Sequence, residues 1–186
     1  RGPRFRVGAA LGSLQGGRAE FLVEKAAELG AAAVVPLLTA RSDTVRAGRV
    51  ERLRRVALSA SKQSLRLHHL EVAEPISVAE MAGVIQTEGA GAPAGGLALL
   101  AAQGAPPLTS YSGALRSAAA PTFLLVGPEG DFTDEEVEHF AEAGALPVGL
   151  GDLRLRVETA AIALLGGCQA QCEEGLGEGN SVIDNF

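Results

Sequence analysis

The order of apolar and polar positions along the chain predicts short strands that alternate with amphipathic helices. Alternating or purely apolar runs predict strands at 4–7, 33–38, 97–101, 123–126 and 146–150. Apolar residues spaced three or four apart predict helices at 20–29, 46–65, 134–143 and 160–168. Strands alternating with helices are typical of an α/β fold with a parallel sheet.

Local signals indicate where some of these elements end. Thr133 with Glu136 three residues later is the capping-box pattern that begins a helix, and Phe132 can pack on Val137. Gly144 is expected to end that helix. The stretch 89–121 is rich in Ala, Gly and Pro, so outside its strand it is predicted to be loop. The tail at 173–186 is acidic and Gly-rich at its start, and is expected to be flexible.

Composition narrows the class of protein. The 186 residues suit one domain, with at most a small appendage, and 47% hydrophobic residues argue against overall disorder. No uncharged apolar run approaches the roughly 20 residues that span a bilayer, so no membrane association is expected. The histidines and cysteines lack the spacing of a metal site, so no metal is expected.

The distribution of charge matters more than its total of −6. Residues 1–66 hold 13 basic and 5 acidic residues, a balance of +8, whereas residues 67–186 hold 3 basic and 17 acidic residues, a balance of −14. Eight of the basic residues fall within 41–66. This asymmetry indicates a surface for a polyanion such as RNA, although a solvated basic helix explains it about equally well.

Two glycine-containing loops follow predicted strands. The strand at 123–126 runs into 127–131, and the strand at 146–150 runs into Gly151-Asp152. Ligands of open parallel sheets bind at the carboxyl ends of strands, where these loops would lie. Neither loop matches a dinucleotide fingerprint or a Walker A motif, and ordinary turns alone would also explain the glycines.

Five sequence blocks, in order, resemble the RsmE family of methyltransferases, which act on N3 of a uridine in small-subunit ribosomal RNA. Residues 24–30 resemble the family's K-x-x-E-L-G helix, 36–42 its P-x-x-T-x-R-S loop and 62–66 its Q-S-x-R helix end. Residues 126–132 resemble its I-G-P-E-G-x-F turn, and 150–160 its L-G-x-x-x-L-R-x-E-T-A block. Together the blocks cover most of the chain from Arg18 to Leu165.

The chain also departs from the family pattern. Many members have glycine where this chain has Asp131, and many read L-G-P-R-I-L-R-T-E-T where this chain has Asp152, Leu153, Arg154 and Val157. The R-L-R-V-E-T version is similar to plant and plastid members, which favours a chloroplast over the alternative of a bacterial-type cytoplasm.

The resemblance implies a SPOUT fold, a parallel sheet flanked by helices with a C-terminal trefoil knot. It implies that residues 1–172 form the methyltransferase domain, with the family's N-terminal PUA-like RNA-binding domain missing or reduced to a stub at 1–7. The cofactor would be S-adenosylmethionine, and the protein would form a homodimer through the knot. The cofactor-binding residues would be Gly127, Glu129, Gly130, Leu150, Gly151 and Leu155.

The methyl-transfer chemistry suggests roles for two further residues. Methylation at N3 requires loss of the N3 proton and stabilisation of negative charge on the uracil, and an arginine is suited to the second task because it is always cationic. Arg156 is therefore the catalytic candidate, and Glu158 could orient Arg156 or accept the proton. The structural alternatives are an ion pair for Arg156 and helix capping for Glu158.

Contact with small-subunit ribosomal RNA is assigned to cations of the basic half: Arg18, Lys25, Arg41, Lys62 and Arg66. Two alternatives remain open at this point. One is a SPOUT methyltransferase that acts on another RNA, and the other is a non-catalytic RNA-binding or ribosome assembly factor.

Overall fold

The computed structural model describes residues 4–13, 16–42, 47–90, 95–119 and 121–173. Within them, seven strands pair in parallel to form one sheet. They are β1 (Phe5–Ala9), β2 (Ala33–Leu38), β3 (Glu71–Val72), β4 (Ile76–Ser77), β5 (Leu97–Ala101), β6 (Thr122–Val126) and β7 (Leu146–Val148). The strand order is β3-β2-β1-β6-β5-β7, and β4 also pairs with β2.

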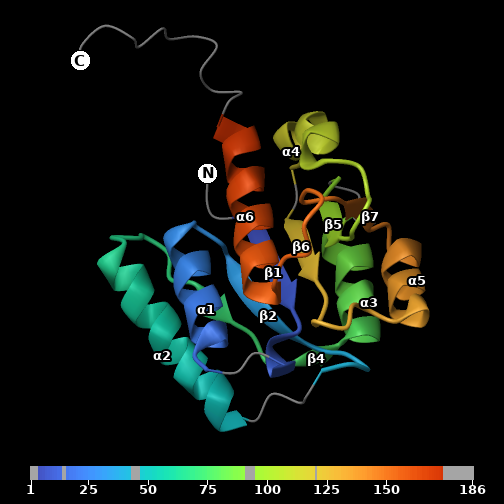
Figure 1. Cartoon of the computed structure of the whole chain (residues 1–186). Helices are drawn as coiled ribbons and strands as arrows, with labels where there is room; N and C mark the ends of the chain where they lie inside the picture. The colour runs from blue at the N-terminus through green and yellow to red at the C-terminus, as the bar shows by residue number, and fades with distance from the viewer. Residues whose placement is uncertain (1–3, 14–15, 43–46, 91–94, 120, 174–186) are drawn as a thin grey trace, which may run out of the picture.

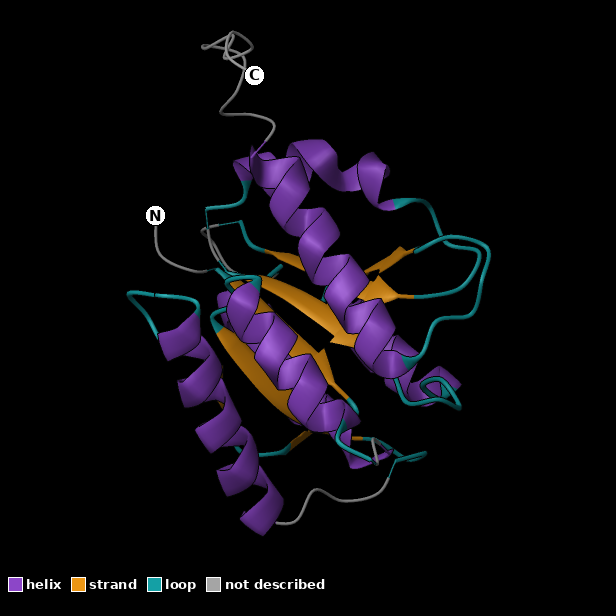
Figure 2. Cartoon of the chain, turned by 60° about the vertical axis from the view of Figure 1, so that its left-hand side comes forward, coloured by secondary structure: helices purple, strands orange, loops and turns teal. Residues whose placement is uncertain are grey.

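Helices cover both faces of the sheet (Figure 1). The α-helices are α1 (Arg18–Glu28), α2 (Ala47–Gln63), α3 (Val78–Glu88), α4 (Ser112–Ser117), α5 (Asp134–Glu142) and α6 (Val157–Glu173), with short 3-10 turns at Leu11–Ser13 and Leu108–Tyr111. Helices α1, α2 and α6 lie on one face, and α3 and α5 on the other. Figure 2 shows α1 and α6 side by side across the first face.

The longer strands β1, β2, β5 and β6 are buried on both faces, which explains their nearly continuous apolar sequences. In β6, Leu124 and Val126 belong to the core beneath α1 and α6, while Phe123 and Leu125 belong to the core beneath α3 and α5. This two-sided core agrees with the SPOUT-type sheet flanked by helices. The trefoil knot stays a prediction, since strand order and register do not determine it.

Several predicted elements agree with the structure to within a few residues. The predicted strands at 33–38 and 97–101 match β2 and β5, and the capping box of Thr133 and Glu136 begins α5. Phe132 packs edge-on against Phe140, with ring centroids 5.2 Å apart, whereas Val137 remains 40% exposed. The aromatic pair therefore anchors Phe132, and the Phe132–Val137 staple stays a prediction.

Two predictions need correction. The stretch 89–121 is not loop outside its strand, because it contains the turn at Leu108–Tyr111 and α4. Residues 5–7 are not a stub of another domain, because they lie in β1, which is paired on both sides, with β2 and with β6. The flexible tail predicted at 173–186 lies outside the described residues except for Glu173, which ends α6.

Among the helices of the described residues, none combines the length and the apolar character that a membrane crossing requires.

Candidate functional site

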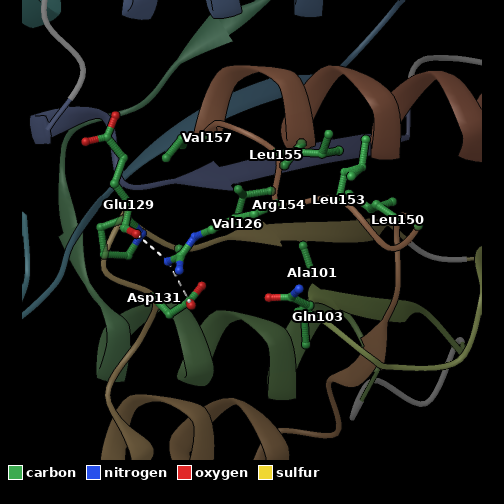
Figure 3. Close-up of a pocket in the computed structure, with 15 residues that line it drawn as sticks. Ala101, Gln103, Val126, Glu129, Asp131, Leu150, Leu153, Arg154, Leu155 and Val157 are labelled. Carbon is green, nitrogen blue, oxygen red and sulfur yellow. Dashed lines mark hydrogen bonds and ion pairs between the residues drawn. The ribbon is translucent and has the colours of Figure 1, made fainter.

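A pocket opens at the carboxyl ends of three neighbouring strands (Figure 3). One wall is 101–103 at the end of β5, a second is the loop after β6, and the third comes from the connection between β7 and α6. The strands end at the same edge of the sheet because all of them are parallel. The pocket therefore lies where open parallel sheets bind their ligands.

Five of the six predicted cofactor-binding residues line this pocket: Gly127, Glu129, Leu150, Gly151 and Leu155. They come from two loops that are more than twenty positions apart in the sequence, so the fold brings the two predicted loops together. Gly130 does not line the pocket. Its carbonyl oxygen instead accepts a hydrogen bond from Arg41, 2.6 Å away.

Sequence reasoning missed the wall at the end of β5, formed by Ala101, Ala102 and Gln103. A usable signal was present, because Gly104 follows this strand closely and the strand itself was predicted at the observed positions. Sequence reasoning also missed the pocket residues Val126, Pro128, Asp131, Leu153, Arg154, Val157 and Ala160. Most of these are small or apolar, and side chains of that kind give no chemical signal of their own.

Gly149 permits the close approach of two pocket-forming loops. Its amide donates to the carbonyl oxygen of Pro106 at 2.8 Å, and Pro107 forms a parallel β-bridge with it. A Cβ at position 149 would lie 2.4 Å from the carbonyl oxygen of Ala105, which is too close for any side chain. The glycine is thus required by backbone packing beneath the pocket.

Three arginines from separate segments contact the turn at 128–131. Arg18, at the start of α1, pairs with the Glu129 carboxylate at 2.6 Å, and Arg41, after β2, donates to the Gly130 carbonyl oxygen. Arg154, from the third wall, donates to the Glu129 carbonyl oxygen at 2.6 Å and to Asp131 Oδ2 at 3.2 Å. Arg18 and Arg41, assigned to RNA from sequence, therefore also hold the loop that lines the pocket.

Glu158 lies beside Arg18, not in an ion pair with Arg156. It is 6% exposed in the first turn of α6, and its Oε2 is 3.9 Å from Arg18 Nη1. That oxygen is buried and has no hydrogen-bond partner among the described residues. The hydrogen bond to Glu129 raises the pKa of Arg18 above its ordinary value, with a smaller contribution from Glu158. The expectation that Glu158 orients Arg156 finds no contact in the structure.

Arg156 is exposed immediately before α6, and its side chain forms no ion pair with a described residue. It does not line the pocket, although Leu155 and Val157 on either side of it do. Its carbonyl oxygen accepts the amide of Ala160 at 2.8 Å, which fixes the backbone at the start of the helix. The backbone of Arg156 is thus fixed between two residues that line the pocket, and its side chain is exposed to solvent.

Two of the predicted RNA-binding cations have protein partners elsewhere. Lys25 pairs with Glu24 at 2.9 Å and with Glu28 at 2.8 Å, and these hydrogen bonds raise its pKa. Arg66 donates to the carbonyl oxygens of Ala27 and Ala31, at 2.9 and 2.7 Å. Partial burial lowers the pKa of Arg66.

The cations of α2 differ in whether they have ion-pair partners. Arg52 pairs with Glu20, and Arg54 pairs with Glu51 and Glu74. Lys62, by contrast, is exposed and has no ion pair with a described residue. Of the five predicted RNA contacts, Lys62 is therefore the one that the structure leaves most available.

A search of the described residues for three or more His, Cys, Asp and Glu side chains that could share a metal ion gives none.

Comparison with known proteins identifies the family to which the chain belongs. Residues 2–169 match the family described as RNA methyltransferase domain. The chain is 29% identical over 176 residues to ribosomal RNA small subunit methyltransferase E of Bacillus subtilis, with 91% of this chain and 67% of the relative covered. The relative of the same name from Synechocystis is 31% identical over 170 residues, and the match covers 90% of this chain and 54% of the relative.

The solved structures that this chain resembles include further methyltransferases. Ribosomal RNA small subunit methyltransferase E of Neisseria gonorrhoeae, solved with bound S-adenosylmethionine, has a TM-score of 0.74 and 27% identity over 90% of this chain and 66% of its own. The SpoU methyltransferase AviRb of Streptomyces viridochromogenes, at 15% identity and a TM-score of 0.57, shares the fold, with 94% of this chain and 61% of its own covered. The chain thus spans about two thirds of the length of several relatives and about half of the Synechocystis protein. The match over nearly the whole described chain shows that this protein belongs to the RNA methyltransferase domain family.

Proposed function

We propose that this chain is the catalytic domain of an S-adenosylmethionine-dependent enzyme that methylates N3 of a uridine in small-subunit ribosomal RNA. The observation that carries the proposal is the pocket at the ends of β5, β6 and β7, in which the two predicted cofactor loops meet. The relatives named methyltransferase E, two of them from Bacillus and Synechocystis, support the RNA substrate.

The lining of the pocket fits the proposed cofactor. Val126, Leu155 and Val157 provide apolar surface for the adenine ring, while the ends of the strands and the glycine loops offer backbone donors and acceptors. Gln103 adds an amide. S-adenosylmethionine, when bound, would supply the methyl group, because its methyl carbon is electrophilic and its sulfur leaves as the neutral thioether of S-adenosylhomocysteine.

We assign the charge-stabilising role to Arg156. As N3 loses its proton, negative charge develops on the uracil ring, and a guanidinium near the carbonyl oxygens stabilises it. The exposed position of Arg156 beside the pocket supports this role. Glu158 stays a candidate proton acceptor, since one of its oxygens has no hydrogen-bond partner among the described residues.

We propose that the protein forms a homodimer and that its C-terminal segment is knotted. The Ala102 amide donates to Val148 and the Gly149 amide donates to Pro106, so the segment after β5 lies against the segment after β7. From there the chain passes from the α5 face to the α6 face, which supports a crossing of these two segments.

The homodimer needs an apolar surface on each copy. Leu146, 40% exposed, offers such a surface for a second copy, and light scattering of the purified protein would measure the dimer.

The bacterial sources of the relatives support a bacterial-type cytoplasm over a chloroplast as the compartment.

Two measurements test the proposed activity. Calorimetric titration with S-adenosylmethionine is expected to show binding, and no binding by a folded protein would exclude the enzyme in favour of an assembly factor. Incubation with the cofactor and small ribosomal subunits, followed by mass spectrometry of nucleosides, is expected to reveal N3-methyluridine. Methylation of a transfer RNA base or of a ribose instead would favour a SPOUT methyltransferase with another target.

A further inference from the structure

Arg154 joins two of the loops that form the walls of the pocket. This residue lies on the connection between β7 and α6, and its guanidinium reaches the turn after β6 (Figure 3). It donates to the Glu129 carbonyl oxygen at 2.6 Å and to Asp131 Oδ2 at 3.2 Å. Arg154 and Asp131 both line the pocket, so the contact joins two of its walls.

Asp131 holds a backbone conformation that disfavours a side chain. Its φ is +60°, and its amide donates to the Pro128 carbonyl oxygen at 2.9 Å to close the turn. Residues with a Cβ rarely adopt this left-handed conformation, which glycine adopts without strain. Aspartate is among the residues with a Cβ that adopt it most readily, so position 131 can carry this side chain at a modest cost.

We infer that Arg154 and Asp131 form a latch, a pair of positioning residues that holds the two cofactor loops at the separation in which they receive S-adenosylmethionine. The inference rests on the proposed cofactor but not on the RNA target.

The latch is expected to act weakly and to depend on salt. The side chain of Arg154 is 62% exposed and that of Asp131 77%, and exposed ion pairs contribute little. The bond from Arg154 to the Glu129 carbonyl oxygen does not need the aspartate and adds a second hold on the same turn.

Asp131→Asn isolates the ion pair, because asparagine keeps the size of the side chain and tolerates the left-handed conformation. In stopped-flow measurements at low salt it is expected to raise the dissociation rate of S-adenosylmethionine by about threefold. Arg154→Ala, which also loses the carbonyl contact, is expected to raise it by about tenfold. Asp152→Asn is the matched control, since Asp152 is exposed on the same loop and does not line the pocket.

The double variant decides whether the two residues act together. In the Arg154→Ala background, Asp131→Asn is expected to have no further effect, and the single effect of Asp131→Asn should vanish in about 1 M salt. Independent, additive effects of the two substitutions would overturn the latch.

A second readout separates failure of the latch from failure of the proposed function. Hydrogen exchange of the empty protein is expected to speed up at both 127–131 and 150–155 in Asp131→Asn but not in Asp152→Asn. If the wild-type protein does not bind S-adenosylmethionine, the proposed function fails and this exchange pattern alone decides the latch. Unchanged exchange at either loop would refute it.

Discussion

The pocket edge of the sheet and the basic surface of α1 and α2 differ in whether the residues predicted to act together lie together in the structure. At the pocket, loops that are distant in sequence meet, and five of the six predicted cofactor residues line one site. On the basic surface the predicted RNA-binding cations do not meet. Lys25 pairs within α1, Arg66 binds carbonyl groups at the end of α1, and Arg18 and Arg41 turn toward the pocket loop.

The difference shows which kind of site can be located from sequence. The position of the pocket follows from the backbone, because parallel strands must end at one edge and glycine loops must follow them. The partner of a long cationic side chain follows from neighbours that only the tertiary structure supplies. A stretch of eight basic residues in 41–66 therefore overstated the surface available to RNA.

The largest effect is expected beneath the pocket, where the backbone leaves no room for a side chain. Gly149→Ala should lower the free energy of unfolding by about 3 kcal/mol, because its Cβ would overlap the carbonyl oxygen of Ala105. Urea denaturation measures this, with Gly113→Ala as the control, since a Cβ there meets no atom within 4 Å. Equal stability of the two variants would mean that the loop packing is not rigid.

Arg156→Ala should reduce turnover about a hundredfold and leave the affinity for S-adenosylmethionine within about twofold of wild type. The exposed guanidinium lies outside the pocket lining, so its loss should affect the substrate and not the cofactor. Single-turnover methyl transfer and calorimetry measure the two quantities, with Arg116→Ala on α4 as an exposed control. A parallel loss of cofactor binding would instead place Arg156 in the support of the cofactor loop.

Arg66→Ala should destabilise the fold by about 2 kcal/mol, because two carbonyl groups near the end of α1 lose a charged donor. Arg66→Lys should recover only part of this loss, since an ammonium cannot reach both oxygens with the same fork. Thermal or urea unfolding measures the change, and Arg55→Ala on exposed α2 serves as the control. A stable Arg66→Ala protein with weakened RNA binding would restore the sequence-based assignment.

The smallest effect is expected for single cations of the basic surface. Lys62→Gln should weaken RNA binding about twofold to threefold and reduce the dependence of affinity on salt by roughly one phosphate contact. Lys25→Gln should have less than half that effect, because Glu24 and Glu28 already pair with this ammonium. Filter binding over a series of salt concentrations compares them, with Arg116→Gln as reference. Equal effects would mean that RNA displaces the two glutamates.

Much of the architecture could be predicted because apolar periodicity and end signals agreed, as at β2, β5 and the Thr133 capping box. Helix α4 could not, since six residues rich in small side chains in an Ala-, Gly- and Pro-rich stretch resemble a loop. The latch residues could not be predicted as a pair either. Their contact depends on how two loops face each other across the pocket, and nothing in the spacing of Asp131 and Arg154 encodes it.

The central position of β1 has a consequence for how the chain folds. Phe5 pairs with Thr122 and Ala9 with Val126, so one edge of the first strand stays open until most of the chain is present. Closing such a distant contact carries a large loop entropy, which makes folding slow. During synthesis the β6-facing edge of β1 therefore stays unpaired until β6 has been made. Nascent chains that stop before residue 122 are expected to require chaperones or to aggregate.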